Sequence, residues 1–248
     1  MKYRKLEGTD LTVPQYVLGT GDYASNVPAD IARDLLKTYV DCGGTMLDTS
    51  HYYGSFLVGG RSLSECLVGD FLQENHLREQ VLISTKGCCY ATNKPYEKRM
   101  TPAFLRSDLT ESLRNLHTDY IDFYWLHQDD PSQPVGSILE ELNRCVEEGK
   151  IRYFGCSNWK IERILEADAY AEAHGLRKFS ANQVMLNMAY PNMTAVDELI
   201  QTWLTPGMRK NHERTQQPVF AYCSQASGFF YNCFKDDYME NIGYSYSR

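Results

Sequence analysis

Four polar side chains suited to proton transfer stand at or soon after the ends of apolar, strand-like stretches: Asp48, Tyr53, Lys86 and His127. The first of these stretches covers residues 45–47, the second 81–85 and the third 121–126. A fourth, 151–156, ends on Ser157 and Asn158. Apolar strands that each stop on a polar group, with helical segments between them, predict a parallel barrel whose C-terminal rim carries an active site.

The chemistry expected of these four groups is proton transfer to a carbonyl oxygen. A free tyrosine has a pKa of about 10, and a lysine ammonium kept charged by a carboxylate would lower the pKa of Tyr53. His127 could donate a hydrogen bond to the oxygen or share the proton transfer. The set could polarise a C=O bond but contains no electron source, so a hydride-donating cofactor is required.

Each of the four residues also has an ordinary structural explanation when it is taken alone. Asp48 could cap a loop, Tyr53 is one of 18 tyrosines, and His127 could be a satisfied rim histidine. Lys86 is more unusual, because a lysine at the end of an apolar strand must be paired or exposed. The combination on successive strand ends favours the catalytic interpretation. The six histidines show no metal-ligand spacing, so no metal site is expected.

The composition is that of ordinary globular material. The chain has 248 residues, of which 43% are hydrophobic and 23% are charged. Length alone allows one domain or two. A single α/β barrel needs about 250 residues, and the chain shows no internal repeat or low-complexity linker, so we expect one domain spanning residues 1–248.

Charge and cysteine usage restrict the partners. A net charge of −7 argues against nucleic acid or an anionic membrane surface, because no basic face is available to neutralise phosphates. No apolar run approaches the roughly 20 residues of a membrane span, and residues 1–10 precede no apolar segment of a secretory signal. The eight cysteines fit a reduced cytoplasm better than a disulfide framework. A small-molecule substrate and a monomer or homo-oligomer are expected.

The hydrophobic pattern predicts a hairpin over residues 3–18 and seven strands, near residues 17, 45, 81, 121, 151, 180 and 219. Helices are expected at 30–42, after Ser62, after Thr101, over 138–146, after Ser157 or Asn158, and at 194–204. In the first helix, Ile31, Leu35, Tyr39 and Cys42 form the apolar stripe. A polar connection is expected over 206–217, and residues 225–248 show no strand–helix pair.

Two α/β architectures compete for this alternating pattern. Crossovers of this length predict parallel strands joined by right-handed connections. An open doubly wound sheet is the nearest alternative to a barrel, but Gly19-Thr20-Gly21 lacks the third glycine and the helix of its phosphate-binding turn. An incomplete (β/α)8 barrel of about seven units is therefore the expected fold.

Six motifs in consistent order resemble the aldo-keto reductase superfamily. Residues 48–54 resemble its Asp-Thr-Ala-x-x-Tyr-Gly motif, and 64–69 its Ser-Glu-x-x-Leu-Gly motif. Residues 84–86 and 126–127 are similar to its catalytic-lysine and catalytic-histidine strands. Residues 155–158 with 182–183, and 221–224, resemble its nicotinamide-binding positions. The likeness extends to about Phe230.

The resemblance implies a TIM barrel that reduces aldehydes or ketones with NADPH, reversibly towards alcohol oxidation. It implies Tyr53 as general acid, Asp48 and Lys86 as the pair that tunes it, and His127 as the group that orients the carbonyl. The implied cofactor-binding residues are Gly21, Asp48, Ser157, Asn158, Gln183, Tyr222, Cys223, Ser224, Gln225, Ser227 and Gly228.

The chain departs from the family pattern at its C-terminus and in residues 54–62, a longer approach to the next helix that could shape the substrate mouth. It stops about where the family's last strand–helix units begin, and the positions that hold the adenosine 2′-phosphate have no counterpart. NADP(H) is thus implied by the resemblance, with NAD(H) possible. The alternatives are a cofactor-binding regulatory or sensor subunit without catalysis, and an inactive truncated reductase. The rim aromatics suit either an apolar substrate or simple packing: Tyr23, Tyr52, Phe56, Tyr90 and Trp125.

Overall fold

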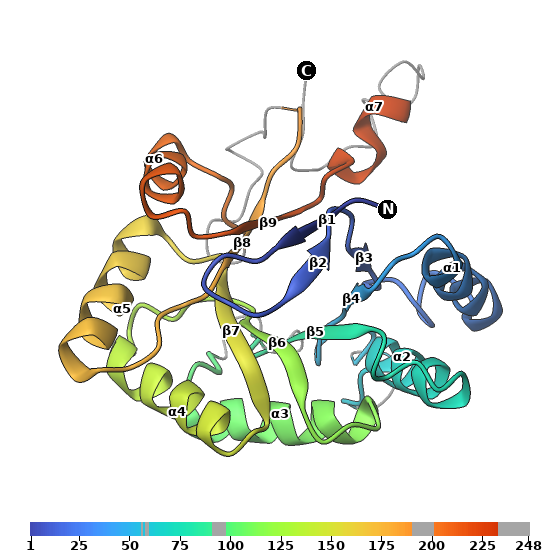
Figure 1. Ribbon diagram of the computed structural model, residues 1–248, viewed down its shortest axis with the longest axis horizontal. Helices are drawn as coiled ribbons and strands as arrows, with labels where there is room; N and C mark the ends of the chain where they lie inside the picture. Colours follow the sequence, from blue (N-terminus) through green and yellow to red (C-terminus); the bar gives the residue numbers. More distant parts are fainter. Residues whose placement is uncertain (56, 58–59, 91–97, 190–200, 233–248) are drawn as a thin grey trace.

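A curled parallel sheet with helices around its outer side forms the body of the protein, as the computed structural model shows (Figure 1). The structure describes all residues except 56, 58–59, 91–97, 190–200 and 233–248. The sheet strands pair in chain order: β3 (Leu18–Gly19), β4 (Met46–Asp48), β5 (Leu82–Gly87), β6 (Ile121–Leu126), β7 (Ile151–Ser157), β8 (Asn182–Met185) and β9 (Val219–Tyr222). Each neighbouring pair is parallel. The predicted incomplete barrel is confirmed, and within the described residues β3 and β9 are its two edges.

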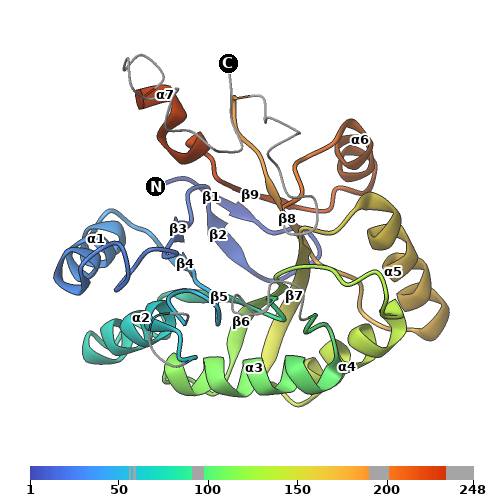
Figure 2. The same ribbon diagram turned by 180° about the vertical axis from the view of Figure 1, so that it is seen from behind.

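The outer layer consists of helices that connect successive strands, which both views show (Figures 1 and 2): α1 (Ala29–Asp41), α2 (Leu63–Glu74), α3 (Pro102–Asn115), α4 (Val135–Glu147), α5 (Ile161–His174) and α6 (Pro206–Thr215). The hydroxyl of Ser62 accepts a hydrogen bond from the N–H of Glu65 at 3.1 Å, and that of Thr101 accepts one from the N–H of Phe104 at 3.3 Å. These side chains satisfy amides that the first helical turn leaves free. Both predicted helix starts are confirmed.

Three expected elements differ from the structure. The segment expected to be a polar connection contains α6, which begins with a Thr205 cap and Pro206 at its first turn, the same signal that starts α3. Helix α5 begins at Ile161 after Lys160, so Ser157 and Asn158 do not cap it. In the segment expected to be helical at 194–204, residues 194–200 lie outside the described part, and Trp203 forms a bridge with Met185 instead.

The buried face of α1 differs from the predicted stripe. Ala32 and Leu36 are fully buried, whereas Ile31 and Leu35 are 49% and 45% exposed. Helix α1 follows the edge strand β3, and α2 is its neighbouring helix on one side. Periodicity identifies an amphipathic helix, but the neighbours available in space determine which residues are covered.

The predicted N-terminal hairpin closes one end of the barrel. Strands β1 (Tyr3–Lys5) and β2 (Thr12–Pro14) pair antiparallel, and the hairpin lies over the centre of the curled sheet, inside the ring of helices, in Figure 1. The hairpin side chains Leu6, Leu11 and Val13 belong to one apolar cluster with four residues of the barrel: Met46, Phe123, Trp125 and Ala181. A larger apolar cluster lies between the sheet and the helices. The hairpin therefore leaves the opposite, C-terminal rim available for a site.

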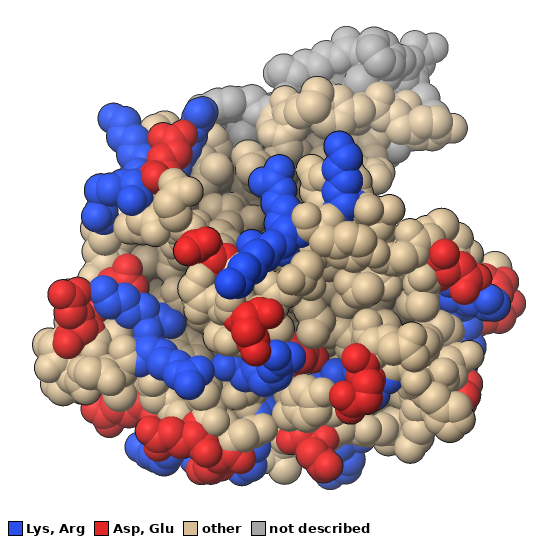
Figure 3. Space-filling view, viewed as in Figure 1, with Lys and Arg blue, Asp and Glu red and all other residues tan. Residues whose placement is uncertain are grey.

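Charged side chains of both signs are interspersed over the helices on the face shown in Figure 3, with a concentration of Lys and Arg over α6. Several form salt bridges between helices, such as Arg106 with Glu148 at 2.7 Å and Arg33 with Glu74 at 2.6 Å. Across the described residues, no helix is long and apolar enough to cross a membrane. Six of the described cysteines are free thiols: Cys42, Cys66, Cys88, Cys89, Cys145 and Cys156.

One test of the outer layer uses the close contact between α2 and α3. A Cβ atom on Gly69 would lie 2.3 Å from the carbonyl oxygen of Asn115 and 2.7 Å from Cα of Leu116. Because backbone atoms cannot move aside cheaply, Gly69→Ala should lower the free energy of unfolding by about 1–3 kcal/mol in urea denaturation. Gly207→Ala, in α6, is the matched control, since its Cβ would meet only the Thr205 hydroxyl at 3.9 Å. Equal stability of the two variants would contradict this packing.

Candidate active site

The four predicted catalytic side chains meet at the C-terminal rim of the barrel. Asp48 is the last residue of β4, Lys86 lies near the end of β5, and His127 directly follows β6. Tyr53 is on the loop that leaves β4. These three strands are neighbours and run parallel, so their C-terminal ends bring the groups to one place.

The Lys86 ammonium is the most constrained group of the site. Lys86 is 2% exposed, and its Nζ donates to Oδ2 of Asp48 at 2.6 Å and to the carbonyl oxygen of Thr49 at 2.7 Å. The same Nζ lies 4.8 Å from the centre of the Tyr53 ring. A buried ammonium is tolerated only when a carboxylate and hydrogen-bond acceptors such as these replace the water that it has lost.

Asp48 is itself held in place by a second layer of hydrogen bonds. Its Oδ1 accepts from the hydroxyl of Ser84 at 2.7 Å, and this hydroxyl accepts from the indole N–H of Trp125 at 2.7 Å. The sequence interpretation did not identify Ser84 as part of the site. Its position two residues before Lys86, on the same face of a strand, was the available signal.

The electrostatics of Tyr53 and Lys86 correct one expectation. Burial raises the pKa of Tyr53 above its ordinary value, and attraction from Lys86 only partly offsets this, whereas a lowered phenol pKa was expected. Burial disfavours the charge on Lys86, but Asp48 and Tyr53 outweigh it and raise the pKa of the lysine. At neutral pH the phenol is therefore protonated and the ammonium is charged.

His127 is neutral in this environment. Burial and repulsion from the Lys86 ammonium lower the pKa of His127 to about 3. Its ring lies edge-on to the ring of Tyr53, with centroids 5.8 Å apart and planes at 86°. An uncharged imidazole beside a protonated phenol can donate one hydrogen bond without adding positive charge.

Residues predicted to hold a cofactor continue the same rim along β7 and β8. Ser157, the last residue of β7, and Gln183, the second residue of β8, are register partners and are buried. The amide of Gln183 donates to Oδ2 of Asp48 at 3.4 Å, which connects these positions to the predicted catalytic residues. Gly21 is also adjacent, because a Cβ on it would lie 3.8 Å from Cζ of Tyr53.

Asn158 has all its hydrogen-bonding capacity in use. Its Nδ2 donates to the His127 carbonyl at 3.0 Å and to the Ser157 hydroxyl at 3.2 Å. Its Oδ1 accepts from the Tyr222 hydroxyl at 2.7 Å and from the Thr202 N–H at 2.9 Å. Asn158 has a φ of 61°, a left-handed conformation that asparagine tolerates. This residue links the ends of β6, β7 and β9.

The remaining predicted cofactor positions follow the edge strand β9. Tyr222 ends β9 and is half-buried, and the three residues after it are exposed: Cys223, Ser224 and Gln225. Ser227 and Gly228 belong to the short helix η1 (Ala226–Gly228), which precedes α7 (Phe229–Asn232). The structure thus places these positions at the open edge of the sheet.

The aromatic residues considered for the substrate mouth divide into two groups. Tyr23, Tyr90 and Trp125 are buried, and Trp125 belongs to the apolar interior of the barrel, so packing explains these three. Tyr52 is half-buried beside His127, with ring centroids 6.3 Å apart. Phe56 lies outside the described residues.

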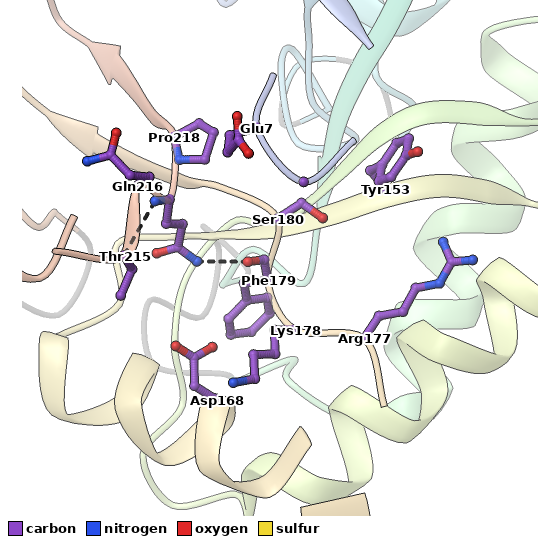
Figure 4. Close-up of a pocket in the computed structure, with 12 residues that line it drawn as sticks. Glu7, Tyr153, Asp168, Arg177, Lys178, Phe179, Ser180, Thr215, Gln216 and Pro218 are labelled. Carbon is purple, nitrogen blue, oxygen red and sulfur yellow. Dashed lines mark hydrogen bonds between the residues drawn. The ribbon is translucent and has the colours of Figure 1, made fainter. Parts of the chain in front are cut away.

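A separate pocket of about 620 Å³ lies at the opposite end of the barrel. Figure 4 shows Glu7 of the hairpin turn, Tyr153 of β7 and Asp168 of α5 around it. No candidate catalytic residue lines this pocket. In the described part of the chain, no group of three or more His, Cys, Asp or Glu could hold a metal ion.

Comparison with known proteins identifies the family. The model of the Aldo/keto reductase family matches residues 16–229, and the chain belongs to this family. Aldo-keto reductase YhdN of Bacillus subtilis is 29% identical over 181 residues, which cover 71% of this chain and 53% of that protein. Norsolorinic acid reductase of Aspergillus flavus is 30% identical over 67% of this chain and 42% of its own length. The chain thus spans about half or less of these two relatives.

A solved structure extends the likeness to nearly the whole fold. The crystal structure of an aldo-keto reductase from Klebsiella pneumoniae in complex with NADPH matches with a TM-score of 0.70 and 26% identity. The match covers 97% of this chain and 73% of that one.

The ionisation of Tyr53 gives a direct test of the site's electrostatics. The ¹³Cζ resonance of Tyr53, assigned by its loss in Tyr53→Phe, should remain that of a protonated phenol past the ordinary tyrosine pKa of about 10. Lys86→Met should move the titration to still higher pH, because the attractive charge is lost. Lys37→Met, which removes an exposed lysine, should leave it unchanged. A Tyr53 titration below the ordinary range would contradict the described burial.

Proposed function

We propose that this protein is an oxidoreductase that transfers a hydride between NADPH and the carbonyl group of an aldehyde or ketone. The observation that carries the proposal is the buried Lys86 ammonium, held by Asp48 at 2.6 Å beside the ring of Tyr53. The aldo-keto reductase from Klebsiella pneumoniae, which matches this fold, was solved in complex with NADPH. This supports NADP(H) as cofactor, with NAD(H) as the alternative that binding experiments must compare.

Tyr53 acts as the general acid in this proposal. Burial raises its pKa, so the phenol carries its proton at neutral pH and can deliver it to the carbonyl oxygen as negative charge develops there. Lys86 stabilises the phenolate that remains, and Asp48 keeps Lys86 charged and oriented. The reverse direction, alcohol oxidation, needs Tyr53 in its phenolate form.

His127 orients the substrate without changing the charge of the site. A pKa of about 3 keeps the imidazole neutral throughout the physiological range, so it can donate a hydrogen bond to the carbonyl oxygen and does not compete with Tyr53 as an acid. Together the two rings define where the oxygen of the substrate would lie.

The chemistry of the rim beyond β6 fits a nicotinamide cofactor. The hydroxyl of Ser157 and the amide of Gln183 are buried register partners, and such groups complement the donors and acceptor of a carboxamide. Asn158 and Tyr222 complete this group of polar side chains, with Gly21 and positions 223–225, 227 and 228 along the adjoining loops. When bound, the cofactor would supply the hydride that no side chain can provide.

A second candidate function is a cofactor-binding subunit that senses nucleotide without turnover. The observation that favours it is that the side-chain amide of Asn158 already forms all its hydrogen bonds, including one that its Oδ1 accepts from the Tyr222 hydroxyl at 2.7 Å. Asn158 can contact a carboxamide only by giving up one of its present hydrogen bonds, so cofactor binding there would release a contact to His127, Thr202 or Tyr222, a structural response of the kind that a sensor requires. Turnover distinguishes this candidate from the reductase.

The decisive experiment measures NADPH and NADH binding by quenching of protein fluorescence beside an aldehyde-reduction assay. Tyr53→Phe should lower kcat by about 10²–10⁴-fold, since the general acid is lost, and Lys86→Met should lower it similarly. Cofactor affinity should remain measurable in both. Tyr16→Phe, which alters a tyrosine that is 70% exposed, is the matched control. Nucleotide binding without turnover in the unaltered protein would favour the sensor.

The pH dependence of the two directions provides an independent check. Because the pKa of Tyr53 is raised, kcat/KM for carbonyl reduction should stay level through neutral pH and fall only in the alkaline range beyond about 10. Alcohol oxidation should rise as pH increases towards that range, because it uses the phenolate. With the pKa of His127 at about 3, neither profile should show a break near 6.5; such a break would indicate a titrating histidine in the site.

A further inference from the structure

The hydroxyl of Ser50 lies at a junction of three groups of the site. Ser50 is fully buried. Its Oγ lies 3.1 Å from Nδ1 of His127, 3.1 Å from the backbone nitrogen of Tyr52 and 3.4 Å from the carbonyl oxygen of Lys86. Ser50 therefore touches the histidine directly, across 77 residues of sequence.

Counting donors and acceptors assigns the hydroxyl proton. The N–H of Tyr52 can only donate, so Oγ of Ser50 accepts that hydrogen bond and has a single proton to give. The carbonyl of Lys86 is the more distant acceptor and already receives the N–H of His51 at 3.0 Å. Nδ1 of His127, at 3.1 Å, is nearer to Oγ of Ser50 than the Lys86 carbonyl oxygen at 3.4 Å, so the distances favour Nδ1 as the acceptor of this proton.

The direction of this hydrogen bond determines the tautomer of the imidazole. A neutral histidine has one N–H, and a ring nitrogen that accepts cannot carry it. We propose that Ser50 is a positioning residue that holds His127 as the Nε2–H tautomer and leaves this N–H to be donated to the carbonyl oxygen of the substrate. The last step rests on the proposed function; the tautomer itself does not.

The surroundings keep both partners in place. The carbonyl of Ser50 accepts from the hydroxyl of Ser62 at 2.8 Å, and Ser62 also caps α2. The backbone N–H of His127 donates to the carbonyl of Gly87 at 2.9 Å, and its carbonyl accepts from Asn158 at 3.0 Å. Neither Ser50 nor His127 can shift without breaking these bonds, so the contact between them is preorganised.

The low pKa of His127 agrees with this assignment, because Nδ1 accepts only while the ring is uncharged.

The first test is spectroscopic and needs neither cofactor nor substrate. In ¹⁵N-histidine-labelled protein, Nδ1 of His127 should resonate as an unprotonated, pyridine-type nitrogen and Nε2 as a protonated, pyrrole-type nitrogen from pH 5 to pH 9. Ser50→Ala should introduce the Nδ1–H form, whereas Ser50→Thr, which keeps a hydroxyl, should preserve the unaltered pattern. A protonated Nδ1 in the unaltered protein would overturn the proposal.

The second test links the tautomer to turnover. Ser50→Ala should lower kcat for carbonyl reduction about tenfold, the effect of losing one orienting hydrogen bond, while NADPH affinity stays unchanged. Ser50→Thr should recover most of the loss. Ser137→Ala, whose hydroxyl bonds only a carbonyl at the start of α4, is the control. Thermal melting of each variant separates this effect from misfolding.

The outcomes of the two tests are distinguishable. A Ser50→Ala protein that melts normally but keeps the unaltered ¹⁵N pattern and kcat would overturn the role of Ser50. If the unaltered protein shows the Nε2–H tautomer but reduces no aldehyde, the proposed function fails while the assignment of the tautomer stands.

Discussion

The interaction on which the rest of the site depends is the ion pair between Lys86 and Asp48. An ammonium that is 2% exposed is tolerated only when a carboxylate and further acceptors replace the water it has lost. The parallel register of β4 and β5 provides this, because Asp48 lies opposite Ser84, two residues before Lys86 on the same face. The hydrogen bond from Ser84 then orients the carboxylate. The register of β4 and β5 therefore determines the positions of Asp48, Ser84 and Lys86, and the loop that follows β4 does not.

The same positive charge sets the state of both neighbouring rings. Lys86 attracts a phenolate at Tyr53 and repels a proton from His127, while burial favours the neutral form of each. The result is a protonated phenol beside a neutral imidazole, as the proposed roles of proton donor and hydrogen-bond donor require. Two titratable rings at contact distance thus have distinct roles because one buried cation acts on them in different ways.

The position of the site within the sheet separates its two functions. The predicted catalytic groups Asp48, Lys86 and His127 lie in or directly after β4, β5 and β6, each of which has a paired strand on both sides. The polar groups that fit a nicotinamide cofactor extend through β7 and β8 to β9, an edge strand in the described part of the chain. The relatives that match this chain are longer than it is. The groups proposed for proton transfer therefore lie on strands that are paired on both sides, whereas the positions proposed for the cofactor reach an edge strand of the described sheet.

The sequence by itself determined the order of the seven sheet strands and of the helices as far as α5, the caps at Ser62 and Thr101, and the polar residues that end successive strands. These features depend on local periodicity and on the neighbours of a residue along the chain. The cap at Thr205 carried an equally local signal that the sequence interpretation did not use. Three features were decided only by the tertiary structure. It determined which face of α1 is buried and whether burial or the charge of Lys86 dominates the pKa of Tyr53. It also brought the hydroxyl of Ser50 to His127. Burial and contacts between residues far apart in sequence depend on how the strands are brought together in space, and the pattern of neighbouring residues along the chain does not encode them.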